Sequence, residues 1–353
     1  KGEIDEYSLN TSIGLSFRGL FDGKMGYSYT EILDDASVEQ LVKMAKENAR
    51  VIDNEDKEFI YDGAGEYVKI NSYSEELAKV TVEEKIKLAM ELEKDTENFC
   101  DKVKTVKTCV VVSGEGSNRI INSKGLDVVH KSNVIYAVVI PVAEQDGQVN
   151  TGDAFAATNK FQEIDTKLLA KESVEKALSY MGGETISSGK YKVAIKNEVM
   201  ADILDTFWGV FSSYNVQKQL SLLKDKTGEQ IASKKVTIVD DPHREDGVSS
   251  TPFDAEGVPT HKKDVLKEGI LQTLLYNLKT AHKDDVKTTG NASKGSYSST
   301  VGISPFNFYI SPGEKGFDAI IAEVEEGVLI TMVEGLHSGA NMVSGDFSLA
   351  AKG

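Results

Sequence analysis

The spacing of apolar residues predicts three amphipathic helices in the first half of the chain, at 37–51, from 81 onward and at 165–181. The first two begin with Ser37-x-x-Gln40 and Thr81-x-x-Glu84. The first of these has the form of a capping box, in which two side chains satisfy free N–H groups at the start of a helix. Two glycines follow the third helix, and glycine commonly ends helices. The predicted buried face of the first helix carries Val38, Leu41, Val42 and Ala45.

Runs rich in β-branched and aromatic residues predict the strands. Residues 7–17 alternate between apolar and polar, and with 27–29 after a glycine-bearing turn they favour a hairpin or meander. Further strands are predicted at 108–112, 119–121 and 128–142, with a turn at 122–125 before the last of them.

A break rich in glycine and serine, 182–189, separates the two halves of the chain. A strand at 191–195 and a helix at 198–214 follow, and short strands separated by turns are predicted beyond them. Helices alternate with strands before the break, and strands predominate after it. The pattern therefore predicts an α+β fold, with an N-terminal α/β domain, 1–185, and a strand-rich C-terminal domain, 186–353.

Charge and composition narrow the classes of function. The 353 residues include 40 Lys and Arg against 56 Asp and Glu, a net charge of −16. No basic residues cluster, and phosphate contacts depend on Lys and Arg, so direct nucleic-acid binding is not expected. The longest apolar run, 134–143, is half the ~20 residues that a membrane helix needs. With no secretory signal at the start, we expect a cytoplasmic protein without a membrane partner.

The two cysteines, Cys100 and Cys109, lie nine positions apart. This spacing matches no metal-binding pattern, so we expect two reduced thiols.

Residues 335–348, the C-terminal loop, follow an apolar run at 327–333 that is predicted to be a buried strand. These fourteen residues, GLHSGANMVSGDFS, include three glycines, three serines, a histidine, an asparagine and an aspartate. Glycine permits tight turns and close backbone approach, and the small polar side chains satisfy or present hydrogen bonds. The segment is therefore either an elaborate structural turn or part of a groove that holds a peptide-like ligand.

The C-terminal loop also contains the residue types of a Ser-His-Asp set, in His337, Ser338 and Asp346. Adjacent side chains on an extended segment point to opposite faces, so His337 would serve Ser338 poorly as a base. Ser344 is the better partner if the segment folds back. The competing interpretation is a set of hydrogen bonds within a glycine-rich loop.

An acidic neighbourhood surrounds a proline turn in the second half of the chain. It favours a solvated loop; the alternative is a surface that attracts a basic peptide or a hard cation. Its members are Asp240, Asp241, Glu245, Asp254 and Glu256.

The sequence of the C-terminal loop resembles the C-terminal signature of the PmbA/TldD family, in its PmbA (TldE) type. Further blocks in the family's order are 13–19, 23–27, 250–260, 267–271 and 288–292. The resemblance spans nearly the whole chain. The family has a strand and a helix before the first block and a β segment after the last, so the resemblance implies a sequence trimmed at both ends. Family members are often described as modulators of DNA gyrase, and any such effect of this acidic chain would be indirect.

The resemblance also implies where a zinc site would lie. TldD-type members bear His-Glu-x-x-x-His on a helix, where imidazoles hold Zn²⁺ and the carboxylate acts as general base. Alignment places that motif at about Leu204, Asp205 and Gly209, so neither histidine is present here. We therefore expect no metal, no cofactor and no catalytic residue in this chain, and whether it is itself an enzyme stays open.

By resemblance, the chain pairs with a TldD-type subunit in a cytoplasmic metallopeptidase heterodimer, and that partner alone carries zinc. Such assemblies trim unfolded peptides. The peptide-groove candidates are His337, Ser338, Gly339, Asn341, Ser344, Gly345 and Asp346, with Thr289, Gly290 and Asn291 from a family block. The alternative is a self-sufficient homodimeric peptidase with a metal or serine site that the sequence does not reveal.

Overall fold

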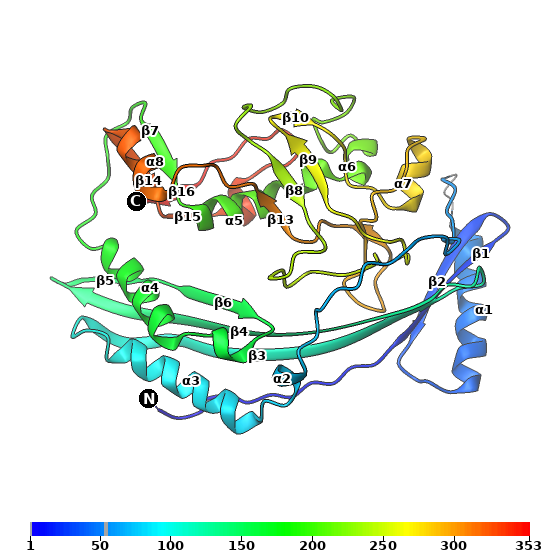
Figure 1. The fold of residues 1–353 in the computed structure, drawn as a ribbon, viewed down its shortest axis with the longest axis horizontal. Helices are drawn as coiled ribbons and strands as arrows, with labels where there is room; N and C mark the ends of the chain where they lie inside the picture. The colour runs from blue at the N-terminus through cyan, green and yellow to red at the C-terminus, as the bar shows by residue number, and fades with distance from the viewer. Residues whose placement is uncertain (1, 53–55) are drawn as a thin grey trace.

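The computed structural model describes residues 2–52 and 56–353. A long antiparallel hairpin, β3 (Val103–Ile121) with β4 (Asp127–Gln145), runs along the length of the molecule (Figure 1). The stretches predicted as two strands, 108–112 and 119–121, both belong to β3, because the pairing with β4 continues through the residues between them. The turn at 122–125 is confirmed: the Gly125 N–H donates to the Asn122 carbonyl at 3.2 Å.

Two helices, α3 (Val82–Glu97) and α4 (Thr166–Ser179), pack against this hairpin. Two short strands, β5 (Gln148–Thr151) and β6 (Ala154–Thr158), extend the sheet from β4. Alternate residues of β4 are buried against the helices, as expected of a sheet with one covered face. The buried core between these layers consists of Leu77, Leu88, Leu92, Ile135, Ala137, Val139, Ala154, Ile164 and Leu169. The short helix α2 (Glu75–Ala78) precedes α3 and contributes the first of them.

At one end of the long hairpin, β1 (Leu15–Phe21) and β2 (Lys24–Thr30) form a second hairpin covered by α1 (Asp35–Val51) (Figure 1). The predicted hairpin is present, but its first strand begins at Leu15 and not at residue 7. The predicted capping box at Ser37 is wrong, because the Asp34 carboxylate accepts the Ser37 N–H at 2.7 Å and α1 begins two residues earlier.

The predicted buried face of α1 is also partly wrong. Leu41 and Ala45 are buried, but Val38 and Val42 are 42 % and 39 % exposed. The helix turns its small side chains towards β2, where a Cβ on Gly26 would overlap the Ala45 carbonyl oxygen. Close approach of helix and strand therefore depends on that glycine.

The C-terminal half lies on the other side of the long hairpin from α3 (Figure 1). Its central sheet has the spatial order β10 (Ile270–Leu271), β9 (Lys263–Lys267), β8 (Ile238–Asp240), β13 (Phe308–Ile310). The other regular elements of this half are β7 (Lys192–Ile195), α5 (Asn197–Phe207), α6 (Ser213–Gln217), α7 (Leu278–Lys283), β11 (Ala292–Ser293), β12 (Gly302–Ile303), α8 (Phe317–Val324), β14 (Gly327–Ile330), β15 (Met332–Glu334), α9 (Leu336–Gly339) and β16 (Ala350–Lys352). The α+β class is confirmed.

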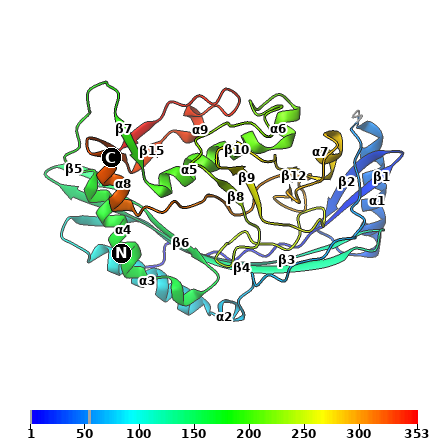
Figure 2. The ribbon, with the colours of Figure 1, turned by 45° about the horizontal axis from the view of Figure 1, so that its top comes forward.

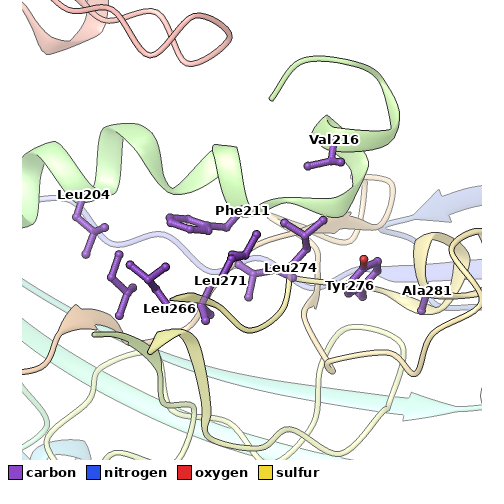
Figure 3. Packing of buried hydrophobic residues seen from close by; sticks show 11 residues of the cluster. Leu204, Phe211, Val216, Leu266, Leu271, Leu274, Tyr276 and Ala281 are labelled. Carbon is purple, nitrogen blue, oxygen red and sulfur yellow. The ribbon is translucent and has the colours of Figure 1, made fainter. Parts of the chain in front are cut away.

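The single helix predicted at 198–214 is interrupted. After α5 the chain makes a 3₁₀ turn at Trp208–Phe211, and Ser212 is extended before α6 begins. The reason is tertiary hydrogen bonding, since the Ser213 N–H and hydroxyl both donate to the Leu275 carbonyl, at 3.0 and 2.7 Å. Below this interruption, side chains from α5, α6 and the central sheet form the C-terminal core (Figure 3).

Residues 327–333 were predicted to form one buried strand. They form two short strands, β14 and β15, whose side chains are only partly buried. Among the described residues, no helix has the length and apolar character needed to cross a bilayer.

Candidate functional site

The two short strands β14 and β15 position the C-terminal loop. β14 pairs in parallel with β7. β15 pairs antiparallel with β16, so the loop leaves at the end of β15 and returns beside it at the start of β16. Its first residue, Gly335, has a φ of +90°, a left-handed conformation that suits glycine. His337 and Ser338 then lie in α9, a single helical turn, and not on the extended segment that the sequence suggested.

The rest of the loop folds back on itself as a small hairpin. Its backbone N–H groups find partners within the loop: Asn341 donates to the Asp346 carbonyl at 2.8 Å, and Ser348 donates to the Gly339 carbonyl at 2.7 Å. The Asn341 side chain accepts the N–H groups of Val343 and Ser344, at 2.9 and 3.2 Å. Asn341 thus orders the tip in the way typical of an Asx turn.

The hairpin also depends on Gly339. A Cβ there would overlap the carbonyl oxygen of Ser348, so any side chain would push the returning strand away. Close backbone approach is one of the properties that glycine-rich loops supply.

The folded loop lines an open, shallow hollow of about 580 Å³. Polar groups and apolar side chains share its surface, with Met342, Val343 and Phe347 each at least 41 % exposed. Exposed apolar groups beside a few hydrogen-bonding groups are typical of sites that bind peptides or small molecules. The residues that line it are Ser338, Gly339, Ala340, Asn341, Met342, Val343, Asp346, Phe347 and Ser348.

The C-terminal loop packs against the end of α5. The rings of Phe207 and Phe347 meet edge to face with centroids 6.1 Å apart. A Cβ on Gly209 would lie 3.0 Å from the Met342 sulfur. Figure 2 shows α9 and the loop beside α5. The helix predicted to occupy the place of a zinc-binding helix therefore borders the hollow.

The three positions of the lost zinc motif have different surroundings: Leu204 and Asp205 lie on α5, and Gly209 lies in the 3₁₀ turn that follows it. The Leu204 side chain is 8 % exposed and belongs to the C-terminal core (Figure 3). Asp205 lines a second hollow, of about 280 Å³, together with Trp208. Gly209 faces the loop. Burial raises the pKa of Asp202, one turn before Asp205, and the charge of Asp205 adds to that shift.

These residues do not fit a zinc ion. Zinc sites in proteins use Cys, His, Asp and Glu ligands, normally three or four of them. α5 offers carboxylates alone at this place, and among the described residues no three such side chains are grouped to hold a metal ion.

The serine hypothesis has no support in the geometry of the described loop. The Ser338 hydroxyl donates to the Gly335 carbonyl at 3.4 Å, and the Ser344 hydroxyl accepts the Asp346 N–H at 3.3 Å. Among the hydrogen bonds of the described residues, none joins His337 to either serine.

The family block at 288–292 lies elsewhere. Thr289, Gly290 and Asn291 are not among the residues that line the 580 Å³ hollow. Thr289 and Asn291 are 7 % and 0 % exposed, and they bond to one another and to the central sheet. Their predicted place in a peptide groove stays a prediction.

The acidic neighbourhood is not a solvated loop, and that prediction is wrong. Four of its five members are buried, because partners from distant segments neutralise or hydrogen-bond them; only Glu245 is exposed. Asp240 pairs with Lys263 at 3.0 Å, and Glu256 with Arg18 at 2.8 Å. Asp254 accepts three backbone N–H groups.

The apolar residues of the site were not singled out in the sequence. Met342, Val343 and Phe347 lie between polar residues without helical or strand spacing, so periodicity gave no reason to select them. The signal available was their presence in a glycine-rich loop, where large apolar side chains have little chance of burial.

Family models cover most of the chain. The models described as PmbA/TldA metallopeptidase domain 1, central domain and C-terminal domain match residues 1–49, 75–180 and 188–353.

Individual relatives agree with these matches. A Thermotoga maritima protein described as a modulator of a DNA gyrase superposes with a TM-score of 0.92 at 36 % identity, over 99 % of this chain and 78 % of that one. The metalloprotease PmbA of Escherichia coli O157:H7 is 24 % identical over 100 % of this chain and 76 % of its own length. TldE of Thermococcus kodakarensis has the same fold, with a TM-score of 0.86 at 20 % identity over 95 % of this chain and 76 % of that one.

Proposed function

This chain belongs to the PmbA/TldA metallopeptidase family, and from that premise we propose that it is a PmbA-type subunit that helps to hold an unfolded peptide for a zinc-bearing TldD-type partner. Its own contribution is binding and positioning, and the hydrolysis takes place at the partner's metal. The proposal places the complex in the cytoplasm.

One observation carries this proposal, namely what occupies the place of the zinc motif. Leu204 packs in the C-terminal core, and Gly209 lies against Met342 of the C-terminal loop. Asp205 is the one carboxylate among the three motif positions. Adding the two missing imidazoles would crowd the Met342 side chain at Gly209 and remove a core side chain at Leu204. The side chains at these positions therefore serve packing against the core and the loop.

The C-terminal loop supplies the features that a peptide-holding surface needs. Met342, Val343 and Phe347 offer apolar contacts for substrate side chains. Ser338 and Asn341 offer hydrogen-bonding groups, which suit the main chain of an extended peptide. Asp346 adds a negative charge, which favours basic residues in the substrate.

The first test is zinc analysis of the chain purified alone, of a TldD-type partner alone, and of the two after joint gel filtration. We expect stoichiometric zinc in the partner and the complex, and peptide cleavage by the complex that a chelator abolishes. In the complex, Asp205→Asn should leave cleavage intact, while Glu→Gln in the partner's His-Glu-x-x-x-His should abolish it. Tight zinc in the isolated chain, with chelator-sensitive cleavage, would refute the proposal. So would a homodimer whose activity disappears in the Ser338→Ala/Ser344→Ala variant.

The second test concerns the loop. Gly339→Ala should displace the strand that carries Phe347 and weaken peptide binding, so that KM of the complex rises about tenfold, the equivalent of about 1.4 kcal/mol. Gly313→Ala is the matched control, because a Cβ there meets nothing within 4 Å. Equal KM values for the two variants would show that the loop does not contact the peptide.

A further inference from the structure

Three polar side chains meet inside the C-terminal half, away from the hollow described above. Asp240 ends β8, Lys263 begins β9 directly opposite it, and Asn291 precedes β11. Asp240 and Asn291 are 0 % exposed, and the Lys263 side chain is 6 % exposed. The proposed function uses none of the three.

Their atoms form a closed arrangement. The Lys263 Nζ donates to Asp240 Oδ2 at 3.0 Å and to Asn291 Oδ1 at 3.1 Å. The Asn291 Nδ2 donates to the same Asp240 Oδ2 at 2.7 Å. One carboxylate oxygen therefore touches both an amine and the nitrogen of a carboxamide, while the amine touches the oxygen of that carboxamide.

We propose that Lys263 and Asn291 join in an intramolecular isopeptide bond, with Asp240 carrying the protons. The Lys263 Nζ bonds to Cγ of Asn291, and the Cγ–Nδ2 bond of Asn291 breaks. Asp240 Oδ2 takes protons from the attacking nitrogen and passes them to the leaving nitrogen, which lies 2.7 Å away. The ammonium group and the carboxamide become one secondary amide and one ammonium ion, so that no oxidant, reductant or other reactant is required.

The surroundings favour each part of this step. Burial lowers the pKa of Lys263, although the Asp240 charge opposes that shift, so the neutral amine that must attack is more accessible. The Thr289 hydroxyl donates to Asn291 Oδ1 at 2.8 Å, where negative charge develops as the amine adds. The Phe306 N–H donates to Asp240 Oδ1 at 2.7 Å and holds the carboxylate in place.

The neighbouring lysine provides a contrast. Lys262 pairs with Asp241 at the same distance, 3.0 Å, but its side chain is 58 % exposed. The hydrogen bond to Asp241 and the charge of that carboxylate raise the pKa of Lys262, so its ammonium group stays protonated in an ordinary surface ion pair. The reactive arrangement is specific to the buried lysine.

The test is the mass of the purified full chain under denaturing conditions. We expect the mass to fall below the sequence mass by one ammonia molecule, and a digest to contain a branched peptide that joins Lys263 to Asn291. The full sequence mass would overturn the proposal. So would the loss of one water, which would indicate an amide to Asp240 instead.

Two variants complete the test. Lys263→Arg keeps the positive charge beside Asp240 but cannot form the amide, so we expect its full sequence mass. Lys262→Arg is the matched control and should keep the loss of ammonia. A mass deficit that persists in Lys263→Arg would contradict the assignment, even if the wild-type deficit were present.

Discussion

Asp254 is a buried carboxyl group at the junction of distant segments. Its Oδ1 accepts the N–H groups of Glu256 and Val258, at 2.8 and 3.0 Å, and its Oδ2 accepts that of Ala292 at 3.0 Å. These bonds favour the ionised form, but burial, followed by the charge of Glu256, outweighs them and raises the pKa to about 7. The folded protein therefore holds a proton that the unfolded chain releases at lower pH.

We predict from this that unfolding free energy decreases as pH rises towards 7. The unfolded pKa of Asp is about 3.9, so the stabilisation is complete below that value and is lost as pH rises through the folded pKa. Within the window the slope from this group is about 1.4 kcal/mol per pH unit. Asp254→Asn should remove that slope in urea unfolding measured across the window.

Glu245→Gln is the control for this experiment, since Glu245 is an exposed member of the same acidic segment. It should keep the wild-type slope. A wild-type slope in Asp254→Asn would show that the carboxyl group of Asp254 titrates alike in both states.

Helix starts are set by local bonding in both α1 and α3, but in different ways. Thr81 forms the full capping box: its hydroxyl accepts the Glu84 N–H at 3.2 Å, and the Glu84 carboxylate accepts the Thr81 N–H at 2.8 Å. α1 instead begins at Asp35, because Asp34 supplies the capping oxygen and leaves Ser37 inside the first turn.

Thr81→Ala should therefore lower the unfolding free energy by about 1 kcal/mol, the usual cost of losing an N-cap. Ser37→Ala, which resembles it in sequence context, should change stability by less than about 0.5 kcal/mol, as surface substitutions usually do. Chemical denaturation of both variants, with Asp34→Ala as a third, measures the difference. Equal losses in Thr81→Ala and Ser37→Ala would mean that both residues cap.

How far the sequence predicts the elements depends on how local their causes are. The start of α3 at Thr81 and the turn at Asn122 follow from residues within four positions, and both were predicted. The break after α5 depends on the Leu275 carbonyl, and the burial of Asp240 depends on Lys263 and Asn291. Such partners lie many residues away, so no local pattern indicated them.

In the C-terminal loop, too, the features with local causes could be predicted and those that depend on distant partners could not. Glycine and asparagine marked the C-terminal loop as special, and the structure shows both ordering it. The packing of Met342 against Gly209 and of Phe347 against Phe207 joins segments far apart in the chain. Only the fold brings these residues to one surface.

At the scale of the whole molecule, polar contacts join the N-terminal hairpin and the segments that follow it to the C-terminal half. The Arg18 guanidinium lies 2.8 Å from Glu256, whose side chain is only 4 % exposed. Lys279 pairs with Glu58 at 3.1 Å, and the Tyr297 hydroxyl donates to Glu31 at 2.5 Å. These three contacts, which we call the seam, are mainly ionic and partly buried.

Arg18→Gln should destabilise the protein by about 3 to 5 kcal/mol, because it leaves the buried Glu256 carboxylate without its cation. Arg119→Gln removes an ion pair of similar geometry with Asp127, but both of those side chains are more than half exposed. That control should leave the unfolding free energy close to the wild-type value, because water already solvates both charges. Guanidinium denaturation compares the two, and similar losses would show that the seam contributes no more than a surface pair.

The distance along the chain between the partners of this seam has a consequence during synthesis. Arg18 emerges from the ribosome more than two hundred residues before Glu256, and Ser16 before Lys294, to which it is hydrogen-bonded. The Arg18 cation of a nascent hairpin therefore remains without its carboxylate partner until the segment that carries Glu256 has been made. Contacts of such long range fold slowly and leave early segments open to misassembly. The time that a growing chain spends in this state, and the chaperones that shield it, will bear on how much active protein a cell obtains.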